Sequence, residues 1–228
     1  RAYDQIIHDV ALQNLPVIFC IDRAGIVGED GATHHGVFDI AYLNCIPNLV
    51  IFAPLNEVEL RNIMYTAQLG LNQPLAIRYP RGRGITIDWK KPFEKIEIGT
   101  GTQLKDGDEL AILSIGTISK NVEEALTHIE NKEAIAHYDM RFVKPLDEKM
   151  LHQIFKKYHH IITIEDNAVT GGFGTAILEF ASKNNYKKSV KTIGIPDIFI
   201  EHGSVDDLQK TVGLDAESLA ILFSELMS

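Results

Sequence analysis

Short apolar runs alternate with segments of helical spacing along most of this chain, and that alternation narrows the choice of fold more than any other feature. Strand-like runs are expected at 15–21, 49–53, 74–78, 97–102, 110–115, 134–139, 160–165 and 190–195. Helices are expected at 3–14, 56–69, 120–129, 147–158, 175–183, 205–212 and 216–227, with a short helical turn at 38–43. Strands that alternate with helices predict an α/β fold with mainly parallel sheets covered by helices.

A break in this pattern at 85–95 predicts a linker between two α/β domains, at 1–84 and 96–228. The first domain has three expected strands, few for a complete sheet, and the second has about five. Helical spacing is already under way at Arg1, so we expect the chain to be a piece of a longer protein. At 105–109, the run KDGDE has the composition of a hairpin turn.

The composition is that of an ordinary globular protein, with 45% hydrophobic and 23% charged residues. Its formal net charge of −9 argues against nucleic-acid binding, which needs a basic face, but leaves room for a small anionic ligand. No apolar run has the length of a membrane span, and no signal peptide is recognised. We expect the two cysteines, Cys20 and Cys45, to be buried and reduced.

The segment at 21–39, IDRAGIVGEDGATHHGVFD, directly follows the first expected strand. Polar loops at the carboxyl ends of strands in open α/β sheets commonly bind ligands. Asp30 and His34 can bind hydroxyl groups and move protons, although a turn-forming Asp and a capping or solvated His remain the alternative. His35 is expected to be the structural member of the histidine pair. A metal site is disfavoured because no further Cys or His stands at zinc-like spacing.

Two other segments are candidates for anion binding. Arg78 ends the third expected strand, and Arg81 and Arg83 follow it. These guanidinium groups could bind a phosphate or could simply be solvated. Thr170 begins the run TGGFG before a helix, which could cradle phosphate. Because the dinucleotide fingerprint is absent, close packing of backbone around these glycines is the better interpretation.

A family resemblance rests on motifs in one fixed order: DRAGIVGEDGATHHGVFD, CIPN, RYPRG, DMRFVKPLD, EDNAVTGGFG and GIPDIFIEHG. In order and spacing they resemble the 1-deoxy-D-xylulose-5-phosphate synthases, a family of transketolase-like thiamine diphosphate enzymes. The resemblance covers essentially the whole chain. It implies the second half of the middle, pyrimidine-binding domain, followed by the whole transketolase C-terminal domain.

The resemblance also implies which parts of the family's cofactor site are missing. The Gly-Asp-Gly motif that holds the diphosphate and Mg²⁺ is absent, since Gly107 stands between two aspartates instead. The glutamate that activates thiamine diphosphate would precede Arg1. We therefore expect no cofactor-binding residue and no metal ligand in this chain, and no activity of the chain on its own.

The family's substrate site is carried over in part. By resemblance, Asp30 and His34 are the catalytic residues, and Arg1, Arg23 and Arg81 bind substrate. The implied reaction condenses pyruvate with D-glyceraldehyde 3-phosphate and releases carbon dioxide, supplying isoprenoid, thiamine and pyridoxal synthesis. The implied protein is a homodimeric, cytoplasmic bacterial transferase. The alternatives are a non-catalytic dimerisation or interaction module and a pyruvate dehydrogenase E1 β-type subunit.

Overall fold

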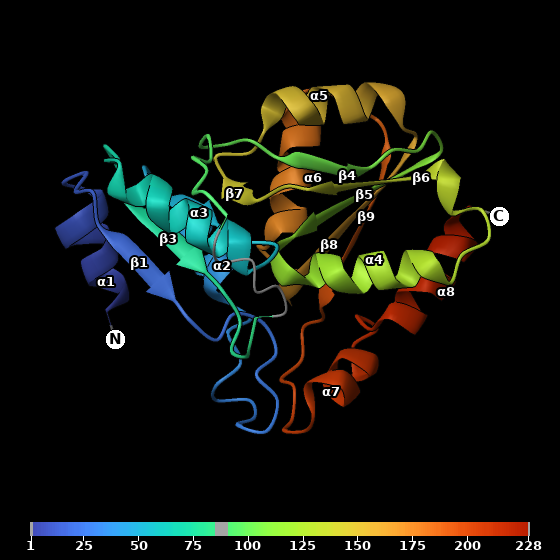
Figure 1. Cartoon of the computed structure of the whole chain (residues 1–228), viewed down its shortest axis with the longest axis horizontal. Coiled ribbons are helices and arrows are strands. Elements are labelled where there is room, and N and C mark those ends of the chain that lie inside the picture. Colours follow the sequence, from blue (N-terminus) through green and yellow to red (C-terminus); the bar gives the residue numbers. More distant parts are fainter. Residues whose placement is uncertain (1, 85–90, 228) are drawn as a thin grey trace.

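The computed structural model describes residues 2–84 and 91–227, which form two mainly parallel sheets lying side by side (Figure 1). The first sheet has the strand order β1-β3-β2-β7 and the second has the order β4-β6-β5-β8-β9. Among the described strands, only β7 and β4 run antiparallel to their neighbours. The predicted α/β class is therefore confirmed. No helix among the described residues is long and apolar enough to span a membrane.

The first sheet is built almost entirely from the N-terminal third of the chain. Its elements in chain order are α1 (Tyr3–Gln5), the π-helical η1 (Ile6–Ala11), β1 (Ile18–Ile21), α2 (Asp39–Asn44), β2 (Val50–Phe52), α3 (Glu57–Gln68) and β3 (Leu75–Arg78). The parallel pairing of β1 and β2 with β3 brings the loops that follow these strands to one edge. That edge holds the segment at 21–39.

The second sheet begins with β4 (Thr102–Lys105), β5 (Leu110–Ile115), the short turn η2 (Gly116–Ile118), α4 (Ser119–Thr127), η3 (Lys132–Ala134) and β6 (Ile135–Asp139). It continues with α5 (Glu148–Lys157), β8 (His160–Ala168), α6 (Phe173–Lys183), β9 (Ser189–Ile195), α7 (Val205–Thr211) and α8 (Ala216–Leu226). Helices α5 and α6 pack on one face, and α4, α7 and α8 on the other (Figure 1). Its central strands are therefore buried on both sides.

Strand β7 (Phe142–Lys144) was not expected, and it joins the first sheet although it follows β6 of the second. It pairs antiparallel with β2, and the ring of Phe142 packs edge-on against Phe52 with centroids 4.8 Å apart. The division at residues 84 and 96 stays a prediction, because residues 85–90 of the expected linker lie outside the described residues. After β6 of the second sheet, the chain returns to the first sheet to form β7.

Two expectations at the start of the second half were wrong. The first strand there is β4 at 102–105 and not at 97–102. The run KDGDE does not close a hairpin, because β4 pairs with β6 while β5 lies on the other side of β6. The backbone N–H groups of Asp108 and Glu109 donate to the carbonyl of Ala134 instead, at 3.1 and 2.9 Å. The turn therefore packs against the start of β6.

The first strand was expected to be buried, and this was also wrong. β1 is shorter than predicted and lies at the edge of its sheet, where its residues alternate between exposed and half-buried. Cys20 on this strand and Cys45 after α2 are free thiols, as expected, but both are exposed. An apolar run alone does not distinguish an edge strand from a central one.

Candidate functional site

The loop between β1 and α2 is folded back on itself by its own glycines. Gly25 and Gly36 exchange two backbone hydrogen bonds of 2.8 and 3.0 Å, and Ala24 donates to the carbonyl of Tyr79 after β3. A Cβ on Gly36 would lie 2.1 Å from the carbonyl oxygen of Arg23, so only glycine fits there. The two ends of the loop are thereby pinned beside the carboxyl end of β3.

The tip of the loop contains two consecutive turns, closed by hydrogen bonds of 3.0 Å from Gly31 to Gly28 and from His34 to Gly31. Both glycines have positive φ, at +92° and +74°. The tip packs against the segment between β9 and α7, where His202 and Gly203 lie close to it. Figure 1 shows these two loops side by side below the sheets. Residues from the C-terminal half therefore support the predicted site loop.

His35 is the structural member of the histidine pair, as predicted. It is 9% exposed, its Nδ1 accepts from the N–H of Val27 at 3.0 Å, and its Nε2 lies 3.2 Å from the carbonyl of Glu201. Since Nδ1 accepts, the proton belongs on Nε2, which donates to Glu201. The imidazole thus joins the loop to the C-terminal half.

Asp30 lies between two arginines from different segments. Its Oδ2 accepts from Nη1 of Arg23 at 3.4 Å and is also ion-paired with Nη1 of Arg81. All three side chains are partly open to solvent, with Asp30 34% and Arg81 55% exposed. Arg23 has a φ of +61°, which is uncommon for a residue with a side chain. Three of the predicted site residues are therefore brought together at the surface.

His34 follows Asp30 closely in the sequence. Its side chain is exposed to solvent. Its Nδ1 shares a 3.0 Å hydrogen bond with the hydroxyl of Thr33. An imidazole held on one nitrogen leaves the other for a ligand. Arg1, the remaining predicted site residue, lies outside the described residues.

Arg78 does not belong to an anion-binding cluster, although the sequence grouped it with Arg81 and Arg83. It is 2% exposed, and its guanidinium donates to Asp39 and to Asp166 at 2.7 Å each. Burial lowers the pKa of Arg78, but the charges of Asp166 and Asp39 outweigh it and hold the pKa above the ordinary value. The hydrogen bonds of this side chain therefore join β3 to α2 and to β8.

The TGGFG run packs closely around a buried carboxyl group, which agrees with the packing interpretation. The Glu165 carboxyl oxygens accept from the N–H groups of Phe173 and Gly174 at 2.7 and 2.9 Å. A Cβ on Gly172 would lie 2.2 Å from Oε2 of Glu165. This carboxyl group occupies the start of α6, where a phosphate would otherwise bind. Burial raises the pKa of Glu165 to about 8.

The sequence interpretation missed the roles of Asp39, Glu165 and Asp166. A signal for two of them was present, since Glu165 and Asp166 form a pair of acids at the end of an expected strand. The partner of Asp166 could not be identified because Arg78 is 88 residues away in sequence. Pairings at that separation depend on the order of the strands.

The described residues do not supply a magnesium site. Across 2–84 and 91–227, no three His, Cys, Asp or Glu side chains gather as a set that could hold a metal ion. Three acids near the strand ends form ion pairs with arginines instead: Asp30, Asp39 and Asp166. The donor set for a metal-bound diphosphate is therefore not found in this part of the chain.

Comparison with known families matches both halves of the chain. The pyrimidine-binding domain of transketolase matches residues 1–84, and the C-terminal domain of transketolase matches residues 99–219. This chain belongs to the transketolase family. The C-terminal match covers more than half of its length.

Curated relatives place this transketolase-family chain beside one kind of enzyme. It is 58% identical over 222 residues to the 1-deoxy-D-xylulose-5-phosphate synthase of Cytophaga hutchinsonii, and 55% identical over 221 residues to that of Bacteroides thetaiotaomicron. Each match covers 96% of this chain but only 35% and 34% of the relative. The resemblance to these synthases is confirmed, and the chain spans about a third of their length.

A solved structure described as a split gene transketolase, inactive β4 tetramer, resembles this transketolase-family chain with a TM-score of 0.83. The two share 27% sequence identity, and the match covers 99% of this chain and 71% of the other. The transketolase of Pichia stipitis is 18% identical with a TM-score of 0.72, which shows the shared fold alone.

Proposed function

We propose that this chain is the substrate-site part of a 1-deoxy-D-xylulose-5-phosphate synthase. The complete enzyme would condense pyruvate with D-glyceraldehyde 3-phosphate, release carbon dioxide and form 1-deoxy-D-xylulose 5-phosphate. One observation carries the proposal: Asp30 lies between Arg23 and Arg81 on the loop that carries His34, where β1 and β3 end. Groups that bind anions, accept hydroxyl protons and exchange protons are thereby combined at a strand-end site.

Thiamine diphosphate, with Mg²⁺, would supply the nucleophilic carbon in such an enzyme. The described residues lack a donor set for the metal, so we assign no cofactor contact to them. We therefore expect the chain on its own to be inactive, and carbon dioxide release from pyruvate by the purified chain with added cofactor would contradict this. The homodimeric state and the bacterial cytoplasmic location stay predictions.

The side chains around Asp30 would bind substrate by exchanging partners. The Arg81 guanidinium is more than half exposed and can turn a free edge toward a phosphate while it remains near Asp30. When a substrate anion takes over part of Arg81, the Asp30 carboxylate becomes free to accept a proton from a substrate hydroxyl. His34, on the same loop, would donate or accept a proton at Nε2. Arg23 would keep Asp30 oriented.

Replacement of Arg81 by alanine in the complete enzyme tests this assignment. We expect the KM for D-glyceraldehyde 3-phosphate to rise about tenfold or more, because a charge-assisted hydrogen bond to phosphate is lost. The KM for pyruvate should stay close to that of the unmodified enzyme. Equal increases for both substrates would contradict phosphate binding by Arg81.

A non-catalytic assembly module is the second candidate function. The similar split-gene transketolase chain is described as an inactive tetramer, which favours an interaction role for a chain of this extent. Sedimentation of the isolated chain would show whether it self-associates. The third candidate function is that of a pyruvate dehydrogenase E1 β-type subunit. Transfer of the pyruvate-derived group to lipoamide instead of an aldehyde would support this candidate.

A further inference from the structure

A cavity of about 600 Å³ lies where the two halves of the chain meet. Some of its lining residues follow β2 and β3 and include Leu55, Tyr79 and Arg81. Others belong to η2 and the first turns of α4 and include Thr117 and Lys120. Its size suits a small ligand, and it reaches the predicted site through Arg81.

The charged groups of this cavity favour an anion. Arg81, Arg83 and Lys120 line it, against Glu57 and Glu123. A cationic excess stands out in a protein whose formal net charge is −9. Burial raises the pKa of Glu123, so this environment disfavours the charged form of its carboxyl group. Leu55 and Leu60 add apolar surface to the lining.

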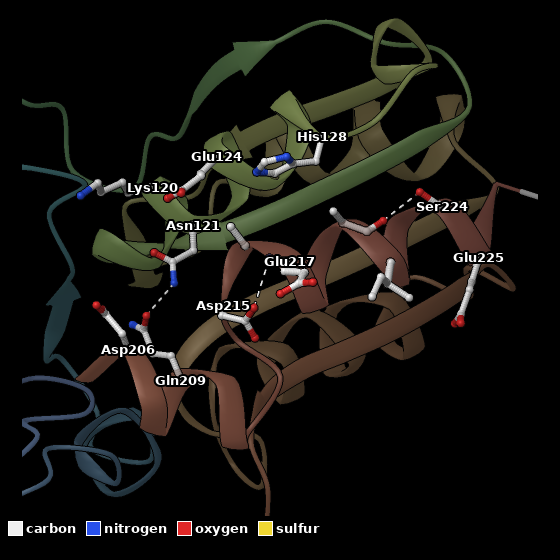
Figure 2. Close-up of a pocket in the computed structure, with 13 residues that line it drawn as sticks. Lys120, Asn121, Glu124, His128, Asp206, Gln209, Asp215, Glu217, Ser224 and Glu225 are labelled. Atoms are coloured by element: carbon white, nitrogen blue, oxygen red, sulfur yellow. Dashed lines mark hydrogen bonds between the residues drawn. The ribbon is translucent and has the colours of Figure 1, made fainter. Parts of the chain in front are cut away.

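Lys120 is free to take part, since it is exposed and forms no hydrogen bond or ion pair with the described residues. It also stands at the end of a separate groove of about 1020 Å³ between α4 and α8, whose other charged residues include Glu124, Asp206 and Glu217. Figure 2 shows the Lys120 side chain pointing away from that acidic groove. Its ammonium group therefore belongs with the cationic side of the cavity between the halves.

We propose that Lys120 is a further phosphate-binding residue, so that both halves of the chain build the site for the aldehyde substrate's phosphate. This inference rests on the proposed function and extends it from Arg81 to a residue of the C-terminal half. A phosphate monoester has three oxygens at its anionic end, and one guanidinium edge engages two of them. An ammonium group is a compact point charge, and that of Lys120 could approach the third oxygen from the C-terminal half of the cavity lining.

The test compares two aldehydes in the complete enzyme. Lys120→Ala should raise the KM for D-glyceraldehyde 3-phosphate roughly three- to tenfold, as expected for one partly exposed ion pair. It should leave the KM for D-glyceraldehyde, which lacks the phosphate, unchanged. Lys120→Arg should restore most of the loss because it keeps the charge, and Lys120→Glu should enlarge it.

Lys149→Ala is the matched control. Lys149 occupies the second position of α5 as Lys120 does in α4, it is exposed, and α5 lies on the far side of the second sheet (Figure 1). A general effect of removing a surface charge near a helix start would appear in both variants, whereas phosphate binding would appear only at position 120.

Two further outcomes separate this inference from the proposed function. If Arg81→Ala raises the KM for the phosphorylated aldehyde and Lys120→Ala does not, the role of Lys120 is overturned and the proposed function stands. If neither variant discriminates between the two aldehydes, the phosphate site itself is misassigned. An equal change for both aldehydes in Lys120→Ala would also overturn the inference, because it would show a structural effect.

Discussion

At the scale of single residues, the ionisable groups at the strand ends divide into two sets by burial. Arg78, Asp39 and Glu165 are buried and hydrogen-bonded to fixed partners, so they serve the fold. Asp30 and Arg81 are partly exposed and share a contact that a ligand could replace. Sequence reasoning found Asp30 through the polar, glycine-rich loop and Arg81 through the arginine cluster after the third expected strand and the family resemblance. It misread Arg78, because neighbouring arginines in sequence do not reveal which one turns inward.

Glu165 gives the protein a pH dependence of known sign. Its pKa is raised to about 8 in the fold, from an ordinary value of 4.5. Between these values the unfolded chain has lost the proton and the folded chain has kept it, so this group's contribution to stability falls as pH rises. We expect Glu165→Gln, which cannot ionise, to reduce the loss of unfolding free energy between pH 5.5 and 7.5 by about 2 kcal/mol.

Urea unfolding of both proteins at these two pH values measures the difference. The glutamine keeps an acceptor for one of the two backbone N–H groups, so the variant should still fold. An unchanged pH slope in Glu165→Gln would show that the carboxyl group ionises as readily in the fold as in the unfolded chain.

At the scale of elements, predictions held where the signal is local. Helices were expected to begin at Asn56 and Asp147, and both side chains cap the observed helices α3 and α5 by accepting from backbone N–H groups of the first turn. β7 was missed because three residues carry no period of their own and pair with β2, about 90 residues earlier. The supposed hairpin failed for a related reason, since turn composition does not say which strand lies alongside.

The two helix caps at Asp147 and Ser204 should differ in strength. The Asp147 carboxylate accepts from the backbone N–H of Met150 at 2.8 Å, at the start of α5. It also accepts, at 3.0 Å, from the N–H of Gly101, a residue that precedes β4. The Ser204 hydroxyl accepts from the N–H of Asp207 at 3.1 Å at the start of α7 and donates to the carboxylate of the same residue at 2.6 Å, both in an exposed position. We expect Asp147→Ala to lower the unfolding free energy by about 2 kcal/mol and Ser204→Ala by about 1 kcal/mol.

Urea midpoints with unchanged m-values would measure both losses. Equal losses in the two variants would mean that the bond from Gly101 adds nothing to the cap.

At the scale of the whole molecule, the two halves are joined by polar contacts as well as by a shared core. β7 brings Arg141 and Lys144 to the first half, where Arg141 donates to Glu59 at 2.6 Å and Lys144 donates to the carbonyl of Asn44 at 3.0 Å. One apolar cluster contains residues of α2 and β2 together with residues of β5, α5 and α6. The motif DMRFVKPLD, to which sequence reasoning assigned no role, therefore holds the halves together. The site between them depends on that junction.

Arg78 is the strongest single test of this junction. Its guanidinium, 2% exposed, joins Asp39 of the first half to Asp166 of the second. Arg78→Met should lower the unfolding free energy by about 3–5 kcal/mol, because two buried carboxylates lose their counter-charge. Adding Asp39→Asn and Asp166→Asn should recover part of that loss, since the remaining groups are neutral. Calorimetry should show one cooperative transition in the unmodified protein and in the triple variant. If Arg78→Met unfolds at the unmodified temperature, the ion pairs do not stabilise the junction, and the shared core alone joins the two halves.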